Sequence, residues 1–197
     1  MRLGSGLADV HGMHERKVNV GIGTDGASCA DNQNVYEAMR LASLASKVQG
    51  PDWQRWLGTD EALHAATEGS ARALGLAKEI GKIAPGYKAD IVFLDLHHVN
   101  WIPMSDPVNQ IVHAEDGSGV HSAMIGGRMV VEDRKLLTVD LPKLAAQAAA
   151  SQAQRAPLTG EAKKLYEKLE TVVGSFCPGL AKAPLHIHRF GASHHCH

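Results

Sequence analysis

The sequence has few of the features that mark a secreted or membrane-spanning protein. Its three cysteines are odd in number, widely spaced and without a CxxC pair, which argues against a disulfide framework and fits a reducing compartment. No apolar run approaches the roughly 20 residues that span a bilayer. The N-terminus lacks the charged and apolar segments of a signal peptide. We therefore expect a cytoplasmic protein with no membrane partner.

Charge of one sign and aromatic residues are also scarce. The formal net charge is −1, aromatic residues make up 5% of the chain, and no lysine and arginine cluster is interleaved with them. Because a basic field is what attracts the phosphate backbone, we expect no nucleic-acid partner. The remaining composition, 44% hydrophobic and 21% charged over 197 residues, is that of a globular protein with one sizeable domain or two small ones.

The first ordered pattern is a β-type run that ends in an Asp-Gly pair. Residues 18–23 mix apolar residues with glycine, which suits a buried parallel strand, and the run halts at Asp25. A helical pattern follows over residues 35–47, with Asp31 or Asn32 placed to cap its start. In α/β barrels, catalytic side chains lie at the C-terminal ends of the strands, and Asp25 occupies such a place. An isolated Asp-Gly pair after a strand is, however, most often only a turn.

The pattern then changes from helix to strand. Residues 60–74 predict a second helix, with Thr59 placed to cap it and Gly75 placed to end it. Residues 89–96 predict a strand with apolar residues on both faces. Residues 122–137 predict a β-hairpin, because two glycines separate two apolar runs.

The last part of the chain is rich in alanine and lysine. It predicts two helices, over residues 141–154 and 159–172, followed by an irregular, histidine-rich tail over residues 176–197. His186 and His188 in this tail have a spacing that metal sites use, but they do not follow a strand. Four residues at the chain end, His194-His195-Cys196-His197, are suited to adventitious metal binding rather than to a physiological site.

Five segments, taken in order, resemble the amidohydrolase superfamily. Residues 18–44, VNVGIGTDGASCADNQNVYEAMRLASL, are similar to the last barrel strand of that family and the helix after it. Residues 59–76 are similar to the helix that follows the barrel, and residues 81–92 to the G-x-I-x-x-G-x-x-A-D segment that enters a β-sandwich. Residues 124–137 are similar to a late hairpin of that sandwich, and residues 3–8 to the loop after the seventh strand.

The resemblance implies a fold of the α/β plus β class. It predicts the C-terminal βα part of an incomplete (β/α)8 TIM barrel, followed by part of a composite β-sandwich and by C-terminal helices. The corresponding domain ranges are 1–78 for the barrel part, 79–140 for the sandwich segment, and 141–197 for the helices and tail.

The resemblance also implies a chemistry, because the nearest branch consists of aminohydrolases that deaminate nucleobase-like, S-adenosylhomocysteine-like and triazine substrates. In that branch Asp25 would be a catalytic residue and a ligand of a divalent metal, with zinc expected and iron the alternative. An aspartate beside a cation stays ionised and can accept a proton from metal-bound water. Ser28 and Asn32 would border the opening for a small-molecule substrate, although capping and packing roles compete for both.

The family's other catalytic groups lie outside this chain. They are a His-x-His pair, two further histidines and a glutamate, and none of those positions falls within the segments that match. A catalytic zinc needs three or more protein ligands, so we predict a chain that is inactive by itself and holds no metal alone. Three interpretations stay open: part of a larger hydrolase, one half of a split enzyme, or a non-catalytic remnant or association module. A homo-oligomer, or association with the missing N-terminal half, is the expected partner state.

Side chains outside Asp25 that could suggest a site are given structural roles instead. His64, within the second predicted helix, is expected to be a partly buried histidine rather than a ligand. Trp53 and Trp56 follow a Gly-Pro break and are expected to pack a loop onto a helix.

Overall fold

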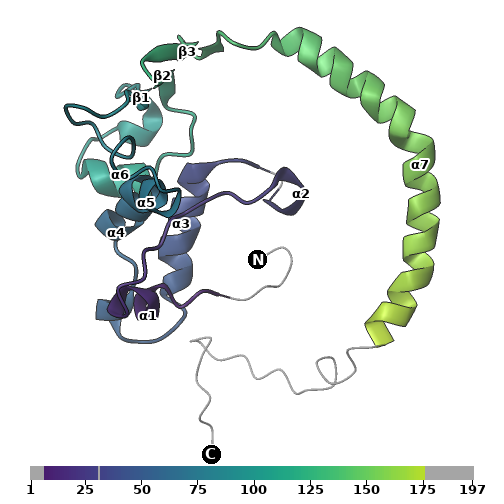
Figure 1. The fold of residues 1–197 in the computed structure, drawn as a ribbon, viewed down its shortest axis with the longest axis horizontal. Coiled ribbons are helices and arrows are strands. Elements are labelled where there is room, and N and C mark those ends of the chain that lie inside the picture. The colour runs from purple at the N-terminus through teal and green to yellow at the C-terminus, as the bar shows by residue number, and fades with distance from the viewer. Residues whose placement is uncertain (1–6, 31, 176–197) are drawn as a thin grey trace, which may run out of the picture. The chain divides into compact units, whose positions relative to one another are not determined.

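The computed structural model describes residues 7–30 and 32–175. Of these, residues 7–135 form one compact unit and residues 136–175 belong to a second, and each is considered by itself. The first unit begins with helices and ends in a small sheet (Figure 1). Its helical elements are α1 (Val10–Glu15), α2 (Ala27–Ala30), α3 (Val35–Ser46), a 3-10 turn (Trp53–Arg55), α4 (Thr59–His64), a π-helical turn (Ala65–Gly69), α5 (Ser70–Ala73), a 3-10 turn (Val99–Trp101) and α6 (Pro107–His113).

Helix α3 confirms the first predicted helix but has a different cap. The side chain of Asn34 accepts hydrogen bonds from the backbone N–H groups of Tyr36 (3.0 Å) and Glu37 (3.3 Å). Asp31 and Asn32 were the expected caps, and this expectation is wrong because a capping side chain must stand directly before the first helical residue.

The second predicted helix is present, but it starts at Thr59 and contains a π-helical turn. Thr59 is its first residue rather than its cap, and the Glu61 carboxylate accepts a hydrogen bond from the N–H of Gly58 (2.9 Å). The turn over Ala65–Gly69 widens the helix between α4 and α5. Gly75, with φ +76°, ends the helix as predicted.

Residues 18–23 form no strand in the part of the chain that the structure describes. They are fastened to the π-helical turn instead: the N–H of Ile22 donates to the Ala65 carbonyl (3.1 Å), and the Asn19 amide donates to the Gly69 carbonyl (2.8 Å). The Ser70 hydroxyl also donates to the Ile22 carbonyl (3.0 Å). A parallel strand needs neighbouring strands to satisfy its backbone, and residues 7–30 and 32–175 place none beside this run. The barrel strand therefore stays a prediction.

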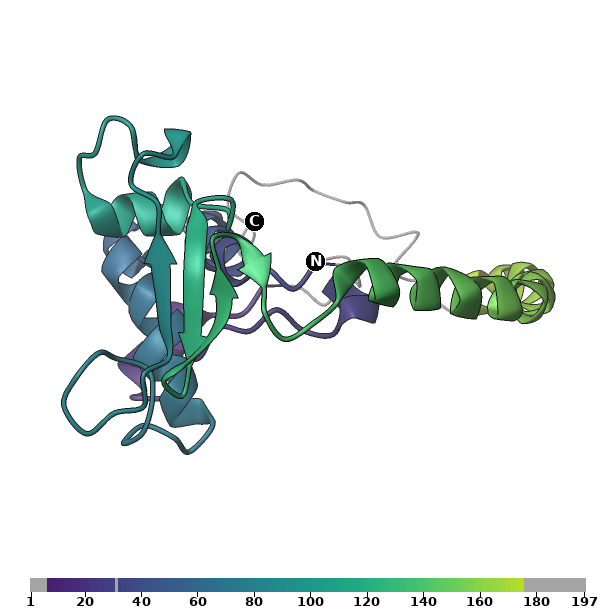
Figure 2. The ribbon, with the colours of Figure 1, turned by 90° about the horizontal axis from the view of Figure 1, so that it is seen from above.

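The sheet has the order β1-β2-β3-β4 and is built from consecutive segments of the chain. Its strands are β1 (Ile91–Leu94), β2 (Val120–Ile125), β3 (Arg128–Glu132) and β4 (Lys135–Leu136). β1 pairs antiparallel with β2, and β2 pairs antiparallel with β3. Most helices of the first unit gather on one side of these strands, whereas α2 stands apart from them (Figures 1 and 2). The predicted strand and hairpin are thus confirmed, with Gly126 (φ +57°) and Gly127 (φ +82°) forming the tight turn between β2 and β3.

The core of the first unit joins the helices before the sheet to the helix inside it. Met39 from α3, Leu57, Ala62 from α4 and Val112 from α6 form one buried cluster. Val112 lies in the predicted sandwich segment, whereas the other three lie in the predicted barrel segment, so side chains from both ranges share one hydrophobic core.

Most of the described part of the second unit is α7 (Leu141–Ser175), a helix of 35 residues. Two helices were expected around Pro157, but the helix continues through this proline. No described helix is apolar enough along its length to cross a membrane. The histidine-rich tail, residues 176–197, lies outside the described residues.

Candidate functional site

Asp25 lies in a tight, solvent-exposed turn between residues 18–23 and α2. Its φ is +61°, a left-handed conformation that aspartate tolerates better than most residues. Three hydrogen bonds hold the turn: the N–H of Gly26 donates to the Asp25 carboxylate (2.7 Å), and the Gln33 side-chain amide (3.0 Å) and the Thr24 hydroxyl (3.3 Å) donate to the Asp25 carbonyl. The backbone of the turn is therefore fixed, while the carboxylate faces solvent.

The two candidate substrate residues occupy different surroundings. Ser28 is exposed in α2, with its Oγ 3.7 Å from the Cys29 Sγ. Asn32 acts as a loop residue: its amide donates to the Glu37 carboxylate, and its Oδ1 accepts from the N–H of Asn34 (3.4 Å). A role for either in substrate binding stays a prediction.

Gln33 is the residue near Asp25 that sequence reasoning did not single out. Its amide donates to the Asp25 carbonyl and to the Asn32 carbonyl (3.3 Å). A glutamine in a polar loop has no distinctive spacing, so only the return of the loop toward the turn reveals its role.

A buried carboxylate organises the loop that packs against the start of α3. The Glu115 side chain is fully buried, and its Oε1 accepts hydrogen bonds from the N–H groups of Asp116 (3.2 Å), Gly117 (2.8 Å) and Gly119 (3.0 Å). Its Oε2 accepts from the Trp101 indole (2.8 Å). The buried carboxylate is thus hydrogen-bonded through both oxygens, to three backbone N–H groups and one side chain.

The same loop touches the cap of α3, close in sequence to Asp25. The Asn34 amide donates to the Asp116 carbonyl (2.6 Å), a hydrogen bond between residues 82 positions apart. Burial of the Tyr36 phenol, together with the Glu115 negative charge, raises the pKa of Tyr36 to about 12. The polar loop after Asp25 is therefore anchored through α3 to the sheet segment.

The described residues do not by themselves make a metal site. Within residues 7–30 and 32–175, no three histidine, cysteine or carboxylate side chains gather closely enough to hold a metal ion. Four of the described histidines pair with single carboxylates, among them His11 with Glu15 (3.3 Å) and His64 with Glu68 (3.9 Å). His64 is also exposed rather than partly buried, because its helix turns that face to solvent.

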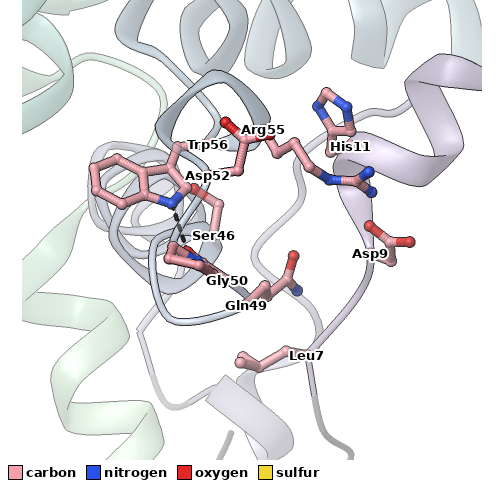
Figure 3. A pocket seen from close by; sticks show the side chains of 10 residues that line it. Leu7, Asp9, His11, Ser46, Gln49, Gly50, Asp52, Arg55 and Trp56 are labelled. Carbon is pink, nitrogen blue, oxygen red and sulfur yellow. Dashed lines mark hydrogen bonds between the residues drawn. The ribbon is translucent and has the colours of Figure 1, made fainter. Parts of the chain in front are cut away.

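A pocket of about 590 Å³ lies at the other end of α3 (Figure 3). In it, Arg55 reaches toward His11 and Asp9, while Trp56 lines the opposite side (Figure 3). The Trp56 indole donates to the Gly50 carbonyl (2.9 Å), so this residue packs its loop as predicted, whereas Trp53 is largely exposed. A helix of 12 residues is about 18 Å long, which separates this pocket from the Asp25 turn.

A second, apolar cavity of about 570 Å³ opens between the helices and β1. Its walls include Met39 from α3, Leu63 and Leu74 from the second helical segment, and Ile91 and Val92 from β1. β1 pairs with β2 on one side only among the described strands. An apolar groove thus runs beside an open strand edge.

The sequence pattern of the amidohydrolase family matches residues 1–130. The chain belongs to this family. It is 40% identical over 144 residues to a 5-methylthioadenosine/S-adenosylhomocysteine deaminase of Acetivibrio thermocellus, covering 73% of this chain and 33% of that protein. This amidohydrolase chain therefore spans about a third of the length of the curated relatives it matches.

Solved amidohydrolase structures share the fold of this chain. An adenosine deaminase from Xanthomonas campestris superposes with a TM-score of 0.73 at 30% identity, over 77% of this chain and 34% of that one. An atrazine chlorohydrolase from Arthrobacter aurescens superposes with a TM-score of 0.69 at 30% identity, over 75% and 33% of the two chains. Both of those structures contain zinc.

Proposed function

We propose that this amidohydrolase chain is the C-terminal part of a metal-dependent deaminase. The reaction would replace an amino group of an adenosine-like or related heterocyclic substrate with oxygen from water, releasing ammonia. The observation that carries the proposal is the exposed, hydrogen-bonded turn of Asp25, in a chain whose relative of known activity deaminates adenosine derivatives.

The role we assign to Asp25 follows from its surroundings. Its carboxylate is exposed, and its turn is held by the Gly26 N–H and the Gln33 amide, so the charge stands at a defined place. An exposed carboxylate of this kind can ligate a divalent cation or accept a proton from water. Ser28 and Asn32 are the residues that we propose for contact with a substrate.

One carboxylate does not fit a catalytic zinc by itself, because such sites use three or more protein ligands. The described residues offer no further group of ligands. We therefore propose that the isolated chain neither holds the metal nor deaminates. The same observation supports the second candidate function, a non-catalytic association module.

The apolar groove and the open edge of β1 support association with a further polypeptide segment. Val92 and Phe93 on β1 are about half exposed, and an unpaired strand edge of this kind readily accepts another strand. The matched segment covers 33% of the Acetivibrio thermocellus relative, so a segment equal to the other two thirds of that protein is the partner we propose.

Complementation tests this function. The chain would be co-purified with the N-terminal two thirds of the Acetivibrio thermocellus deaminase, and ammonia release from 5-methylthioadenosine and zinc content would be measured. We expect ammonia release and bound zinc only in the complex. Asp25→Asn should lower the activity of the complex roughly 10²- to 10⁴-fold. Asp133→Asn is the matched control, since Asp133 also has a positive φ (+48°).

Two results would contradict the proposal. Full activity of the Asp25→Asn complex would show that Asp25 is not a catalytic residue. A complex that forms stably and binds zinc, but releases no ammonia from 5-methylthioadenosine, would support the non-catalytic alternative.

A further inference from the structure

The C-terminal half of α7 carries an apolar stripe with coiled-coil spacing. Leu158, Ala162, Leu165 and Leu169 follow one another at intervals of four, three and four residues. This alternation places them on one face of the helix, at the a and d positions of a heptad. The leucines are exposed, at 67% for Leu158, 59% for Leu165 and 47% for Leu169.

The remaining faces of this half of α7 carry polar residues at the heptad positions outside a and d. Lys163, Lys164 and Glu167 lie away from the stripe, at the outer heptad positions. Glu161 and Lys168 each stand directly before an a residue, at g positions that flank the stripe. One side of the stripe is therefore bordered by a negative and a positive charge seven residues apart.

We propose that residues 158–169 of α7 pair with the same residues of a second copy of the chain, in antiparallel orientation. In that orientation a residues pack against d residues, so that Leu158 meets Leu169 of the second copy and Ala162 meets Leu165. The two-fold axis repeats both layers, which gives four continuous apolar layers, each containing at least one leucine.

The flanking charges select the antiparallel orientation. Antiparallel helices bring g positions together across the interface, so that Glu161 of each copy faces Lys168 of the other, twice per dimer. A parallel pair would bring Glu161 opposite Tyr166 and leave its charge without a cationic partner at that position. The pattern of charges thus distinguishes two arrangements that the leucines alone would allow.

The stripe is short, which limits the affinity. Twelve residues span about 18 Å, and Arg155 takes the next a position upstream, just before Pro157. A small interface of this kind is expected to give a reversible monomer–dimer equilibrium, on the order of micromolar or weaker. The inference does not depend on catalysis by Asp25, and its test does not use activity.

Sedimentation velocity of the full chain, from about 1 µM to about 1 mM, tests the pairing. We expect the mass to rise with concentration from 21.0 kDa toward twice that value. Leu165→Glu places a charge in two of the four layers and should raise the dissociation constant at least about tenfold. Glu167→Lys, on the outer face, is the matched control and should leave it unchanged.

A chain that stays monomeric throughout this range would overturn the proposal. So would a Leu165→Glu variant that dimerises as well as the wild type, because association would then use another surface, such as the edge of β1. Circular dichroism of each variant shows whether α7 keeps its helix content. If Leu165→Glu loses helix content, the variants at Glu161 and Lys168 described below test the pairing instead, because each alters an exposed residue.

Exchange of the flanking charges tests the orientation. Glu161→Lys and Lys168→Glu should each weaken the dimer roughly fivefold or more at low salt, since each creates two like-charge pairs. The double variant E161K/K168E restores both opposite-charge pairs in the antiparallel dimer and should regain the wild-type dissociation constant. Failure of the double variant to recover would overturn the antiparallel arrangement.

Discussion

Glu115 shows how much of this structure depends on single polar side chains. Its buried carboxylate accepts three backbone N–H groups and the Trp101 indole. Glu115→Gln would turn an acceptor into an N–H donor that faces other donors. We expect a loss of about 2–3 kcal/mol in the free energy of unfolding, measured by urea denaturation. Glu132→Gln, an exposed change of the same kind, should cost little, and equal losses for the two variants would argue against this role.

Tyr36 is expected to make the folded protein less stable at high pH. Burial and the Glu115 charge raise its folded pKa to about 12, above the value of about 10 for an unfolded tyrosine. A raised pKa stabilises the fold below about pH 10, and this contribution is lost as the pH rises from about 10 to about 12. Urea unfolding across this range should show a shallower decline in stability for Tyr36→Phe than for the wild type. Parallel declines would show that Tyr36 is not the titrating group.

At the residue scale, the sequence predicted some positions and missed others for a physical reason. Asp25 was singled out because Asp-Gly stood within an ordered set of motifs, and its role in the site stays a prediction. The cap of α3 was misplaced by two or three residues, and Gln33 was not singled out at all. Both depend on how a short polar loop folds back, which is decided by hydrogen bonds rather than by any periodicity.

The hairpin between β2 and β3 illustrates what a single element requires. Both turn glycines have positive φ, as a type I′ turn demands, and no atom lies within 4 Å of a Cβ built on either. A substitution at either glycine therefore destabilises the fold through the strain of a positive φ and not through a steric clash. We expect Gly127→Val to lower the free energy of unfolding by about 1–2 kcal/mol and Gly126→Asn to be nearly neutral, because asparagine tolerates this conformation. Thermal unfolding of both variants checks this, and equal effects would refute a type I′ turn.

Element by element, α3, the helix that starts at Thr59 and the hairpin were predicted because their signals are local, whereas α1, α2 and α6 were not predicted. The conformation of residues 18–23 could not be predicted in the same way. Their composition suits a parallel strand, but a strand exists only with neighbours, and its backbone here turns to the π-helical turn instead. Helix α7 also differs from the prediction, which placed two helices on either side of Pro157. A proline weakens a helix without always ending it, and α7 continues through this one.

At the scale of the whole molecule, the apolar groove beside β1 should respond to a complementing segment. Backbone amides of residues 91–94 that point to the open edge of β1 should exchange rapidly in the chain alone, and more slowly by roughly tenfold or more in the complex. Hydrogen exchange followed by mass spectrometry measures this, with β2 as the internal control because it is paired on both sides. An active complex with unchanged exchange in β1 would place the complementing segment elsewhere.

The predicted division at residues 78 and 79 also belongs to this scale and stays a prediction. The sequence changes character there, yet Val112 packs in the same core as Met39 and Ala62. Sequence patterns report where elements begin, whereas shared burial depends on which elements later come together.

The hydrogen bond from Asn34 to Asp116 has a consequence for how the protein is made. During synthesis the chain leaves the ribosome from its N-terminus, at about 5–20 residues per second. The cap of α3 must therefore wait roughly 4–16 s for a partner that lies 82 residues downstream. During that interval the segment next to Asp25 is made but not yet anchored, so slow translation of residues 79–116 would prolong its exposure to proteases and chaperones.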